Sequence, residues 1–303
     1  MKDIDFQLIS ALEKDGRTSF AHLSRSLGCS ISTIAKKYKQ LVQEGVIETK
    51  AITNPHRLGL VAHAIIAIRT SVGKLESVGN KLAEYPNIEL VVALIGQFNL
   101  IVSIQYPSWD QLHDFISNEL SAISDIREMD IFFTKTNIKR FYDMPFARLD
   151  LPPIRIDKTD RQIIEALSDN GRLSVSNLAH MLALSVSSVS KRLSRLLDEN
   201  VIKVRSIIEY RKIGYDSSAF IFIRTQRQQL DAVCDTLLKY PELSTVITLV
   251  NVYDLFLSAT CKDSANLYDL VNNKIASIGG VDDIIVWPRG KIFKRTFGLF
   301  PDT

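Results

Sequence analysis

The sequence lacks the residues from which a disulfide framework, a zinc ribbon or a membrane span is built. Its three cysteines, Cys29, Cys234 and Cys261, are an odd number, lie far apart and form no CxxC pair. Residues 1–5 are too acidic and too poor in apolar side chains for a signal peptide, and apolar runs such as 90–95 are far shorter than a membrane span. We therefore expect a cytoplasmic protein with no membrane partner.

The common signatures of catalysis and cofactor binding are missing as well. The chain has no glycine-rich phosphate loop, no HExxH and no GxSxG. Its five histidines share no motif and no metal-ligand spacing, and the pair Asp282-Asp283 is typical of the entry to a strand. We expect no enzymatic activity, no cofactor and no metal site. The histidines are His22, His56, His63, His113 and His180.

The composition that remains is that of a folded protein. Apolar residues make up 46% of the chain and charged residues 23%, and 303 residues suffice for two or more domains. The net charge of +3 argues against a histone-like polycation. It does not exclude a nucleic-acid binder, because such proteins often concentrate their positive charge on one part of the surface.

An internal repeat organises the sequence. An offset of 155 residues holds without a gap from Asp5 to Arg140, which is far beyond chance. The chain is therefore a duplication of one domain-sized unit. Pairs at this offset include Gly16-Arg17 and Gly171-Arg172, Gly59 and Gly214, Arg69-Thr70 and Arg224-Thr225, Tyr85-Pro86 and Tyr240-Pro241, and Lys139-Arg140 and Lys294-Arg295.

Each copy begins with a pattern typical of three helices, over residues 1–52 and 157–207. Apolar residues of the first helix recur at helical spacing, and Gly16 or Gly171 is placed to end it as a C-cap glycine. A tight turn separates the second helix from the third, which is the signature of a helix-turn-helix. The expected N-caps are Asp5, Ser19 and Ser30 in the first copy and Asp160, Ser174 and Ser185 in the second.

The third helix of each copy, over residues 30–41 and 185–196, is expected to pack on one side only. Its apolar residues follow a single 3.6-residue spacing, which predicts one buried face. The predicted buried residues are Ile31, Ile34, Ala35, Tyr38, Leu41 and Val42, and in the second copy Val186, Val189, Leu193, Leu196 and Leu197.

The second part of each copy, over residues 60–142 and 215–300, reads as strands and helices in the order βαββαβ. This is the ferredoxin-like split unit, whose sheet has one face covered by helices and one face that needs a partner. Three prolines between the copies predict an extended linker over residues 143–156. The predicted fold class is α+β, with two tandem copies of a helix-turn-helix domain followed by a βαββαβ domain.

Hydroxyls followed by cations occupy the other side of each third helix. A helix fits the major groove of DNA, where its N-terminal residues reach base edges and its hydroxyls and cations contact phosphates. A solvated charged face is the alternative, but the preceding turn and the recurrence of this order in both copies favour DNA. Each helix-turn-helix segment holds eight Lys+Arg and six Asp+Glu, so one module alone should bind DNA modestly. The predicted DNA-binding residues are Ser30, Ser32, Thr33, Lys36, Lys37 and Lys39, and Ser185, Ser187, Ser188, Lys191, Arg192 and Arg195.

A short turn, Gly96-Gln97-Phe98-Asn99, is the second candidate site. It lies between two predicted strands, and its glycine would let a ligand approach backbone amides that can hold a carboxylate. A plain hairpin turn is the alternative. The second copy has Asn251 in place of Gly96, which argues against two equal sites.

Each copy resembles the Lrp/AsnC (feast/famine) transcriptional regulators over nearly its full length. The matching residues are Asp5, Leu12, Gly16-Arg17, Leu23, Leu27, Ser30, Gly45-Val46-Ile47 and Leu58-Gly59, repeated as Asp160, Leu167, Gly171-Arg172, Leu178, Leu182, Ser185, Val201-Ile202 and Ile213-Gly214. The resemblance implies a winged helix-turn-helix domain that binds double-stranded DNA. It also implies a second domain that dimerises through its sheet, and hence a homo-oligomer.

In this family the second domain often binds an amino acid near a glycine-to-aspartate loop. The resemblance therefore implies effector contacts at Gly96, Gln97, Asn99, Asn251, Val252 and Asp254. Asn99 stands where the family usually has Asp, and Asn251 where it usually has Gly. The tandem arrangement also departs from the usual single copy.

The favoured hypothesis is a sequence-specific DNA-binding transcriptional regulator, modulated by a small molecule such as an amino acid. One chain would act as a covalent pseudo-dimer, in which the sheet domains cover each other's open faces and the third helices address two half-sites. The unequal pairs Lys39/Ser194 and Gln40/Arg195 predict an imperfect palindrome.

Two alternatives remain open. The fold also resembles that of the siroheme decarboxylases, which share the two-domain plan and can be fused in tandem. Such an enzyme needs cationic and histidine side chains around a tetrapyrrole in the second domain. Here the second and third strands of the sheet offer no histidine, and His113 has no counterpart in the second copy. The other alternative is a ligand-sensing oligomer that no longer binds DNA, which disagrees with the intact cationic helices.

Overall fold

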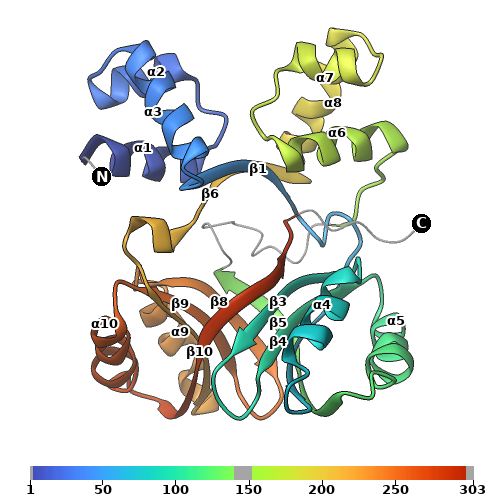
Figure 1. Cartoon of the computed structure of the whole chain (residues 1–303), viewed down its shortest axis with the longest axis vertical. Helices are drawn as coiled ribbons and strands as arrows, with labels where there is room; N and C mark the ends of the chain where they lie inside the picture. The colour runs from blue at the N-terminus through green and yellow to red at the C-terminus, as the bar shows by residue number, and fades with distance from the viewer. Residues whose placement is uncertain (1–2, 140–151, 298–303) are drawn as a thin grey trace. The chain divides into compact units, whose positions relative to one another are not determined.

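The computed structural model describes residues 3–139 and 152–297, which form two compact units that each draw on both copies (Figure 1). The helix-turn-helix unit combines Met1–Leu58 with Pro152–Gly214, and the barrel unit combines Gly59–Leu151 with Tyr215–Thr303. Of the predicted linker, residues 143–151 lie outside the described residues, and residues 152–156 form neither helix nor strand.

The helix-turn-helix unit contains three helices from each copy, in the predicted order. The third helices end before Gly45 (φ 63°) and Asn200 (φ 54°), because these two residue types tolerate the left-handed conformation that stops a helix. The predicted caps Ser19 and Ser174 begin the second helices. The helices are α1 (Asp3–Lys14), α2 (Phe20–Leu27) and α3 (Ile31–Gln43), and α6 (Lys158–Asp169), α7 (Val175–Met181) and α8 (Val186–Asp198).

The strand that follows each third helix pairs with its counterpart from the other copy. β1 (Ile47–Thr53) and β6 (Ile202–Ile208) run antiparallel, with Lys50 opposite Arg205 at the centre. α1 packs on β6 and α6 packs on β1, so each strand supports the first helix of the other copy (Figure 1). Ile208 is accordingly buried in the hydrophobic core of the first copy. The helix-turn-helix modules of the two copies are therefore joined by this strand pair and packed on it.

The glycines after the first helices have a different role from the predicted one. Neither Gly16 nor Gly171 has the positive φ of a C-cap glycine. A Cβ at Gly16 would lie 2.9 Å from the backbone of Arg205, and a Cβ at Gly171 would lie 3.0 Å from the backbone nitrogen of Lys50. Glycine is needed at both places because the strand of the other copy passes against the main chain.

The predicted N-caps of the first helices are wrong as well. Asp160 is the third residue of α6, and the cap is Asp157, which forms a reciprocal capping box with it. Asp5 lies inside α1, which begins at Asp3. Both acidic side chains form ion pairs with the third helix of their own copy.

The barrel unit contains the predicted βαββαβ order twice. In each copy the second helix continues into a π-helical turn, η1 (Phe115–Leu120) or η4 (Leu270–Ile275). The first copy forms β2 (Ala62–Thr70), α4 (Leu75–Glu84), β3 (Ile88–Leu94), β4 (Leu100–Tyr106), α5 (Trp109–Asp114) and β5 (Ile126–Lys139). The second copy forms β7 (Ser217–Thr225), α9 (Leu230–Leu237), β8 (Leu243–Val250), β9 (Leu255–Cys261), α10 (Ser264–Asp269) and β10 (Val281–Arg295). Short 3-10 turns precede β7 and α9 as η2 (Tyr210–Ile213) and η3 (Arg227–Gln229).

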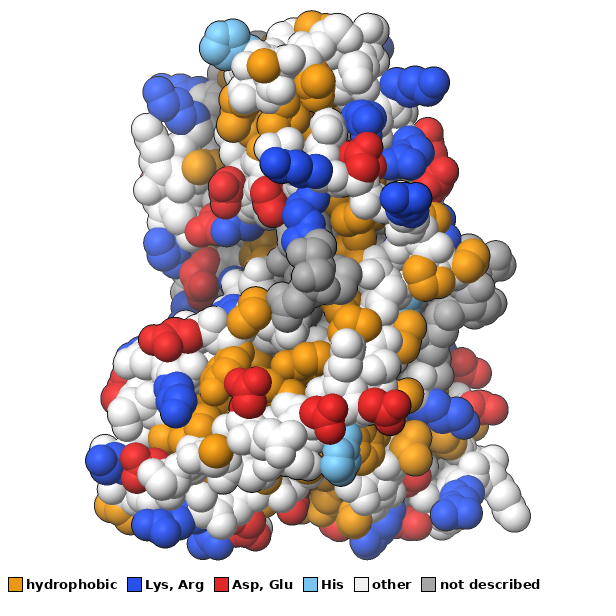
Figure 2. Space-filling view, turned by 90° about the vertical axis from the view of Figure 1, so that its right-hand side faces the viewer, with side chains coloured by type: hydrophobic (Ala, Val, Ile, Leu, Met, Phe, Trp, Pro, Cys, Tyr) orange, Lys and Arg blue, Asp and Glu red, His pale blue; other side chains and the backbone are white. Residues whose placement is uncertain are grey.

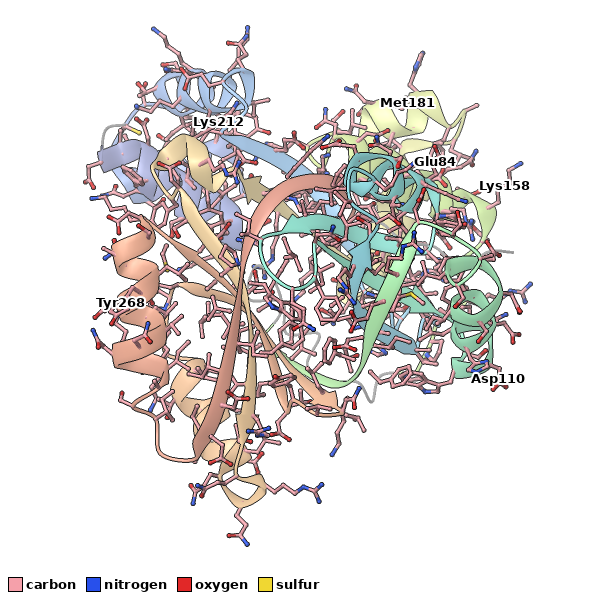
Figure 3. All side chains as sticks on the ribbon, turned by 60° about the horizontal axis from the view of Figure 1, so that its bottom comes forward. Glu84, Asp110, Lys158, Met181, Lys212 and Tyr268 are labelled. Atoms are coloured by element: carbon pink, nitrogen blue, oxygen red, sulfur yellow. The ribbon has the colours of Figure 1, made fainter. Side chains whose placement is uncertain are left out.

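The strands of both copies close into one barrel in the order β10-β3-β4-β2-β5-β8-β9-β7. β5 pairs with β2 of its own copy and with β8 of the other, and β10 does the same with β7 and β3. The interior is apolar and aromatic, and the Trp287 ring contacts the rings of both Phe98 and Phe222. The helices lie outside, where Asp110 on α5 and Tyr268 on α10 point away from the barrel (Figure 3).

The closed barrel explains what covers the open sheet faces. The prediction that each sheet needs a partner is confirmed, and the partner is the other copy of the same chain. The pairing that the family resemblance assigns to two subunits is therefore made within one chain. A homo-oligomer would have to use other surfaces of these domains.

Two kinds of feature were not found in residues 3–139 and 152–297. No helix there is long and apolar enough to cross a membrane. No group of three or more His, Cys, Asp or Glu side chains in this part of the chain is arranged to hold a metal ion.

Candidate nucleic-acid interface

The N-terminal turns of α3 and α8, the two reading helices, present hydroxyl groups around a capped amide. Ser30 Oγ accepts a hydrogen bond from the backbone amide of Thr33 at 3.1 Å and lies 2.8 Å from the hydroxyls of Ser32 and Thr33. The second copy repeats this arrangement with Ser185, Ser187 and Ser188. The first serine of each turn is thus occupied as a cap, and Ser32 and Ser187 are exposed to solvent.

Two apolar residues at these turns are exposed, although the helical pattern predicts that they are buried. The exposed fraction is 53% for Ile31 and 52% for Val186, which hold equivalent positions in the two copies. Val42, near the end of α3, is also exposed. The prediction failed because the apolar pattern of each reading helix extends beyond the body of the module on which it packs. Figure 2 shows hydrophobic side chains at the surface among Lys and Arg side chains on this unit.

Three of the predicted cations extend into solvent. Lys36 and Lys39 on α3 and Lys191 on α8 are exposed, and none has an ion pair within the described part of the chain. Their charge is available to an external anion. Together with Ser32 and Ser187 they form an outward surface of hydroxyls and cations on each reading helix.

Lys37 instead faces its own module. Its ammonium forms an ion pair with Asp5 on α1, and its side chain is only 18% exposed. The pair joins the first helix to the reading helix. Lys37 is therefore placed to orient α3, and its charge is already balanced.

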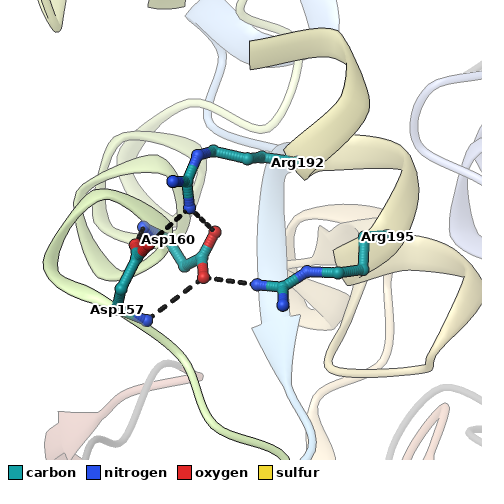
Figure 4. A network of polar contacts seen from close by, with 4 residues as sticks. All are labelled: Asp157, Asp160, Arg192 and Arg195. Carbon is teal, nitrogen blue, oxygen red and sulfur yellow. Dashed lines mark hydrogen bonds and ion pairs between the residues drawn. The ribbon is translucent and has the colours of Figure 1, made fainter. Parts of the chain in front are cut away.

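Arg192 and Arg195 of the second copy face their own module in the same way (Figure 4). Arg192 donates to Asp157 at 2.7 Å and to Asp160 at 2.8 Å, and Arg195 binds the other oxygen of Asp160. Asp160 is 1% exposed in its side chain, so its charge is compensated within the protein. The bond to Asp157 raises the pKa of Arg192, and the backbone amide of Asp160 lowers the pKa of Asp157. Both arginines are thus held against α6.

Sequence reasoning missed two further residues, Arg17 and Arg172, which reach across from one copy to the other. Arg17 donates to the carbonyls of Gly171 and Leu173 at 2.7 and 3.1 Å. Arg172 donates to the carbonyls of Gly16 and Thr18 at 2.5 and 3.0 Å. The available signal was the recurrence of Gly-Arg at the 155-residue offset, which marks the position without revealing its partner.

The predicted effector loops lie in the barrel unit at equivalent positions. Asn99 accepts from the backbone amide of Thr70 at 3.0 Å, and Asp254 accepts from the backbone amide of Thr225 at 2.7 Å. These two side chains hold the ends of β2 and β7 and are therefore occupied. Gly96, Gln97, Asn251 and Val252 are exposed.

Each of these loops contacts the long strand of the other copy. The backbone amide of Ile95 donates to the carbonyl of Pro288 at 3.0 Å, and the side-chain amide of Asn251 donates to the carbonyl of Ile131 at 2.7 Å. Gly96, at φ 148°, packs its backbone close to Trp287. A ligand at either loop would lie beside strands of both copies.

Comparison with known proteins identifies the same two domains in each copy. A model described as winged helix-turn-helix DNA-binding matches residues 1–48 and 156–203, and a model described as Lrp/AsnC ligand binding domain matches residues 63–144 and 218–286. The HTH-type transcriptional regulator FL11 of Pyrococcus furiosus is 34% identical over 117 residues, which are 38% of this chain and 78% of that protein. The chain belongs to the Lrp/AsnC family. It contains the two-domain unit of these DNA-binding regulators twice.

A second regulator and a solved enzyme structure also match this chain. The HTH-type transcriptional regulator LrpA of Pyrococcus horikoshii is 29% identical over 40% of this Lrp/AsnC chain and 87% of its own length. The solved structure of the siroheme decarboxylase NirDL matches with a TM-score of 0.69 and 15% identity, over 98% of this chain and 94% of that one. At this identity the likeness shows a shared fold across both copies.

Proposed function

We propose that this chain is a sequence-specific DNA-binding transcriptional regulator whose two reading helices address the two half-sites of one operator. The observation that carries the proposal is that α3 and α8 both present hydroxyls and unpaired lysines, while β1 and β6 join their modules into one unit. Reading helices of a two-fold protein bind half-sites about one helical turn, or a multiple of it, apart. A single chain would therefore act as the family dimer does.

The two half-sites should differ. Lys39 of the first reading helix corresponds to Ser194 in the second, so the first helix offers one more free cation to phosphates. Gln40 corresponds to Arg195, which is held by Asp160. The N-terminal turns are nearly the same in the two copies. An imperfect palindrome with a common core and unequal flanks is the expected operator.

The experiment is to select bound duplexes from a random pool and to measure the affinity of the selected DNA at several salt concentrations. Replacing Lys36, Lys39 and Lys191 by Ala should weaken binding and reduce the slope of log K against log salt by up to about 3, because each lysine neutralises one phosphate. The matched control replaces three exposed lysines of the barrel unit, with the same change of net charge. These are Lys81, Lys239 and Lys262.

The selected DNA separates the outcomes. A reduced slope in the reading-helix variant and an unchanged slope in the control variant support the proposal. Equal slopes in both variants would remove α3 and α8 from the DNA interface. A random pool from which no duplex is enriched would contradict DNA binding itself.

We further propose that an amino acid modulates this binding through the barrel loops. The proposal is supported by the exposed backbone at Gly96 and by the contact of each loop with the other copy, since a ligand there could change how the copies pack. Because Asn99 and Asp254 are occupied, backbone amides and Gln97 would supply the contacts. The test is DNA affinity with and without each amino acid, for the native chain and for Gly96→Val. An effect that survives this substitution would place the effector elsewhere.

The alternative of an enzyme acting on a tetrapyrrole is supported by the fold that this chain shares with NirDL. Of the histidines, only His63 lies inside the barrel, where its ring nitrogens are 2.8 Å from Ser103 Oγ and 3.0 Å from Thr134 Oγ1. These contacts favour a packed histidine over a ligand. Titration with iron uroporphyrin tests the alternative, since a saturable change in its absorption spectrum would favour the enzyme over the regulator.

A further inference from the structure

The Gly-Arg dipeptides of the two copies form a reciprocal contact between the modules, which we call the arginine clamp. Each guanidinium donates to two carbonyls of the loop that follows the first helix of the other copy. The distances are 2.7 and 3.1 Å for Arg17, and 2.5 and 3.0 Å for Arg172. Hydrogen bonds from a charged donor in a forked geometry fix orientation as well as distance.

Main-chain and buried side-chain bonds lie beneath the clamp. The backbone amide of Gly16 donates to Val204 at 2.9 Å, and that of Gly171 donates to Thr49 at 2.8 Å. The buried hydroxyls of Thr49 and Ser206 lie 2.7 Å apart. The loop after each first helix is thus tied to the strand of the other copy. The modules are held across a short span with little freedom to tilt.

The clamp also touches the first reading helix. Tyr38 on α3 donates to Thr49 Oγ1 at 3.1 Å, and the guanidinium of Arg172 lies 5.1 Å from the Tyr38 ring and 4.4 Å from the Phe20 ring. A cation placed over an aromatic ring in this way is attracted to it. A residue of the second copy therefore sets the position of the reading helix of the first.

Among the described residues, only the aromatic rings of the first copy stack on a clamp arginine in this way. The second-copy equivalents of Phe20 and Tyr38 are Val175 and Leu193, which offer Arg17 no ring. The orientation of α3 thus depends on the other copy more strongly than that of α8 does.

We propose that Arg17 and Arg172 are positioning residues that fix the spacing and angle between α3 and α8, and so determine which half-site spacing the chain accepts. The inference rests on the proposed function, because it needs both reading helices on one duplex. Neither arginine has to contact DNA for this role. Each acts by holding the module of the other copy.

The physical consequence is a sharp preference for one spacing. A second binding event within one molecule gains a factor of about 100 or more when the geometry matches, and loses it when the sites cannot be reached together. One added base pair moves a half-site by about 3.4 Å and turns it by roughly 35°. A rigid clamp cannot follow this change, whereas a loosened one can.

The experiment measures the affinity of the full chain for the selected operator, for versions with one or two base pairs inserted or deleted between the half-sites, and for a single half-site. The native chain should favour the selected spacing over a one-base-pair change by about 100-fold. In R17A/R172A this preference should fall to within about threefold, while affinity for the single half-site is unchanged. R17K/R172K should resemble the alanine variant, because an ammonium cannot make the fork.

Two observations separate positioning from general damage. R155A/R227A removes two exposed arginines outside the clamp and should keep the native spacing profile. The unchanged affinity of R17A/R172A for the single half-site would show that its modules are still folded.

The outcomes distinguish the inference from the proposed function. A native spacing profile in R17A/R172A, with native single-site affinity, would overturn the role of the clamp. Loss of single-site affinity in this variant would show that the arginines only stabilise the fold. If the native chain binds the operator no more tightly than one half-site, the proposed function itself fails.

Discussion

The exposed apolar residues at the tips of the reading helices lead to a prediction about thymine. Ile31 and Val186 follow the N-caps of α3 and α8, where a reading helix meets base edges, and an apolar side chain there can contact the 5-methyl group of thymine. About half of each side chain is left uncovered by folding, at 53% and 52%, and this half is available to DNA. We therefore expect I31A and V186A to weaken operator binding while the chain stays folded, with a loss of stability of about 1 kcal/mol from the half that is buried.

The exposed fractions set the magnitude of the loss. Full burial of an isoleucine or valine side chain stabilises by about 1.5–3 kcal/mol, so covering the exposed half of either contributes about 1 kcal/mol, or roughly fivefold in affinity. Replacing the contacted thymine by deoxyuridine removes its methyl group and should weaken binding by about 0.8 kcal/mol, or roughly fourfold in affinity. In I31A this deoxyuridine effect should disappear at the half-site of α3, because the apolar contact is already gone.

The assay is fluorescence anisotropy at constant salt, with the selected operator and with versions in which single thymines are replaced by deoxyuridine. Val72→Ala is the matched control, since Val72 is fully exposed in the barrel unit and should have no effect. If I31A and the deoxyuridine effect prove additive at every thymine, the tips do not read thymine and the interpretation of their exposure is refuted.

Three further predictions concern the helix-turn-helix unit and the thiols. Gly171→Ala should lower the free energy of unfolding by about 1–3 kcal/mol, because its Cβ would meet the backbone of β1, whereas Gly279→Ala, with open space around it, should be neutral in the same denaturation experiment. Asp160→Asn should destabilise α6 by about 1–3 kcal/mol, seen as faster hydrogen exchange of its amides, because Arg195 loses its counter-charge and Arg192 keeps only Asp157. Burial raises the pKa of Cys234 to about 11, so iodoacetamide at pH 8 should modify partly exposed Cys29 first, and this modification before α3 should weaken DNA binding.

Most of the fold could be predicted from local patterns in the sequence. The serine caps and the residue types at Gly45 and Asn200 act on the nearest helical turn, so they could be read directly from the chain. The βαββαβ order followed from changes of apolar period. The repeat predicted that the open sheets need a partner without deciding between pairing within and between chains, and the structure shows the pairing within one chain.

Contacts between distant segments could not be read in the same way. A glycine such as Gly16 can serve a turn or a close approach, and only the path of β6 decides between them. An acidic residue such as Asp160 can cap a helix or anchor another one, and here it anchors Arg192 and Arg195. An apolar residue such as Ile31 keeps the helical period even where the module beneath it ends.

In the candidate site, too, local features could be predicted from the sequence and contacts between distant residues could not. The residue types were enough to predict the two reading helices. They could not predict which Lys and Arg side chains on these helices lack an ion pair within the described part of the chain. Lys36 and Lys39 differ from Lys37 only in the direction in which the helix turns them, and the partner of Lys37 lies 32 positions earlier in the chain. Arg17 and Arg172 depend on contacts across 154 to 156 positions, which no local pattern records.

Stoichiometric titration of the selected operator with the full chain tests most directly whether one molecule carries both halves of a DNA-binding dimer. Native mass spectrometry at protein and DNA concentrations far above Kd would count the chains bound. Two reading helices in one 34.1 kDa chain predict one chain for every two half-sites, whatever the higher assembly. A ratio of one chain for each half-site would contradict the covalent pseudo-dimer.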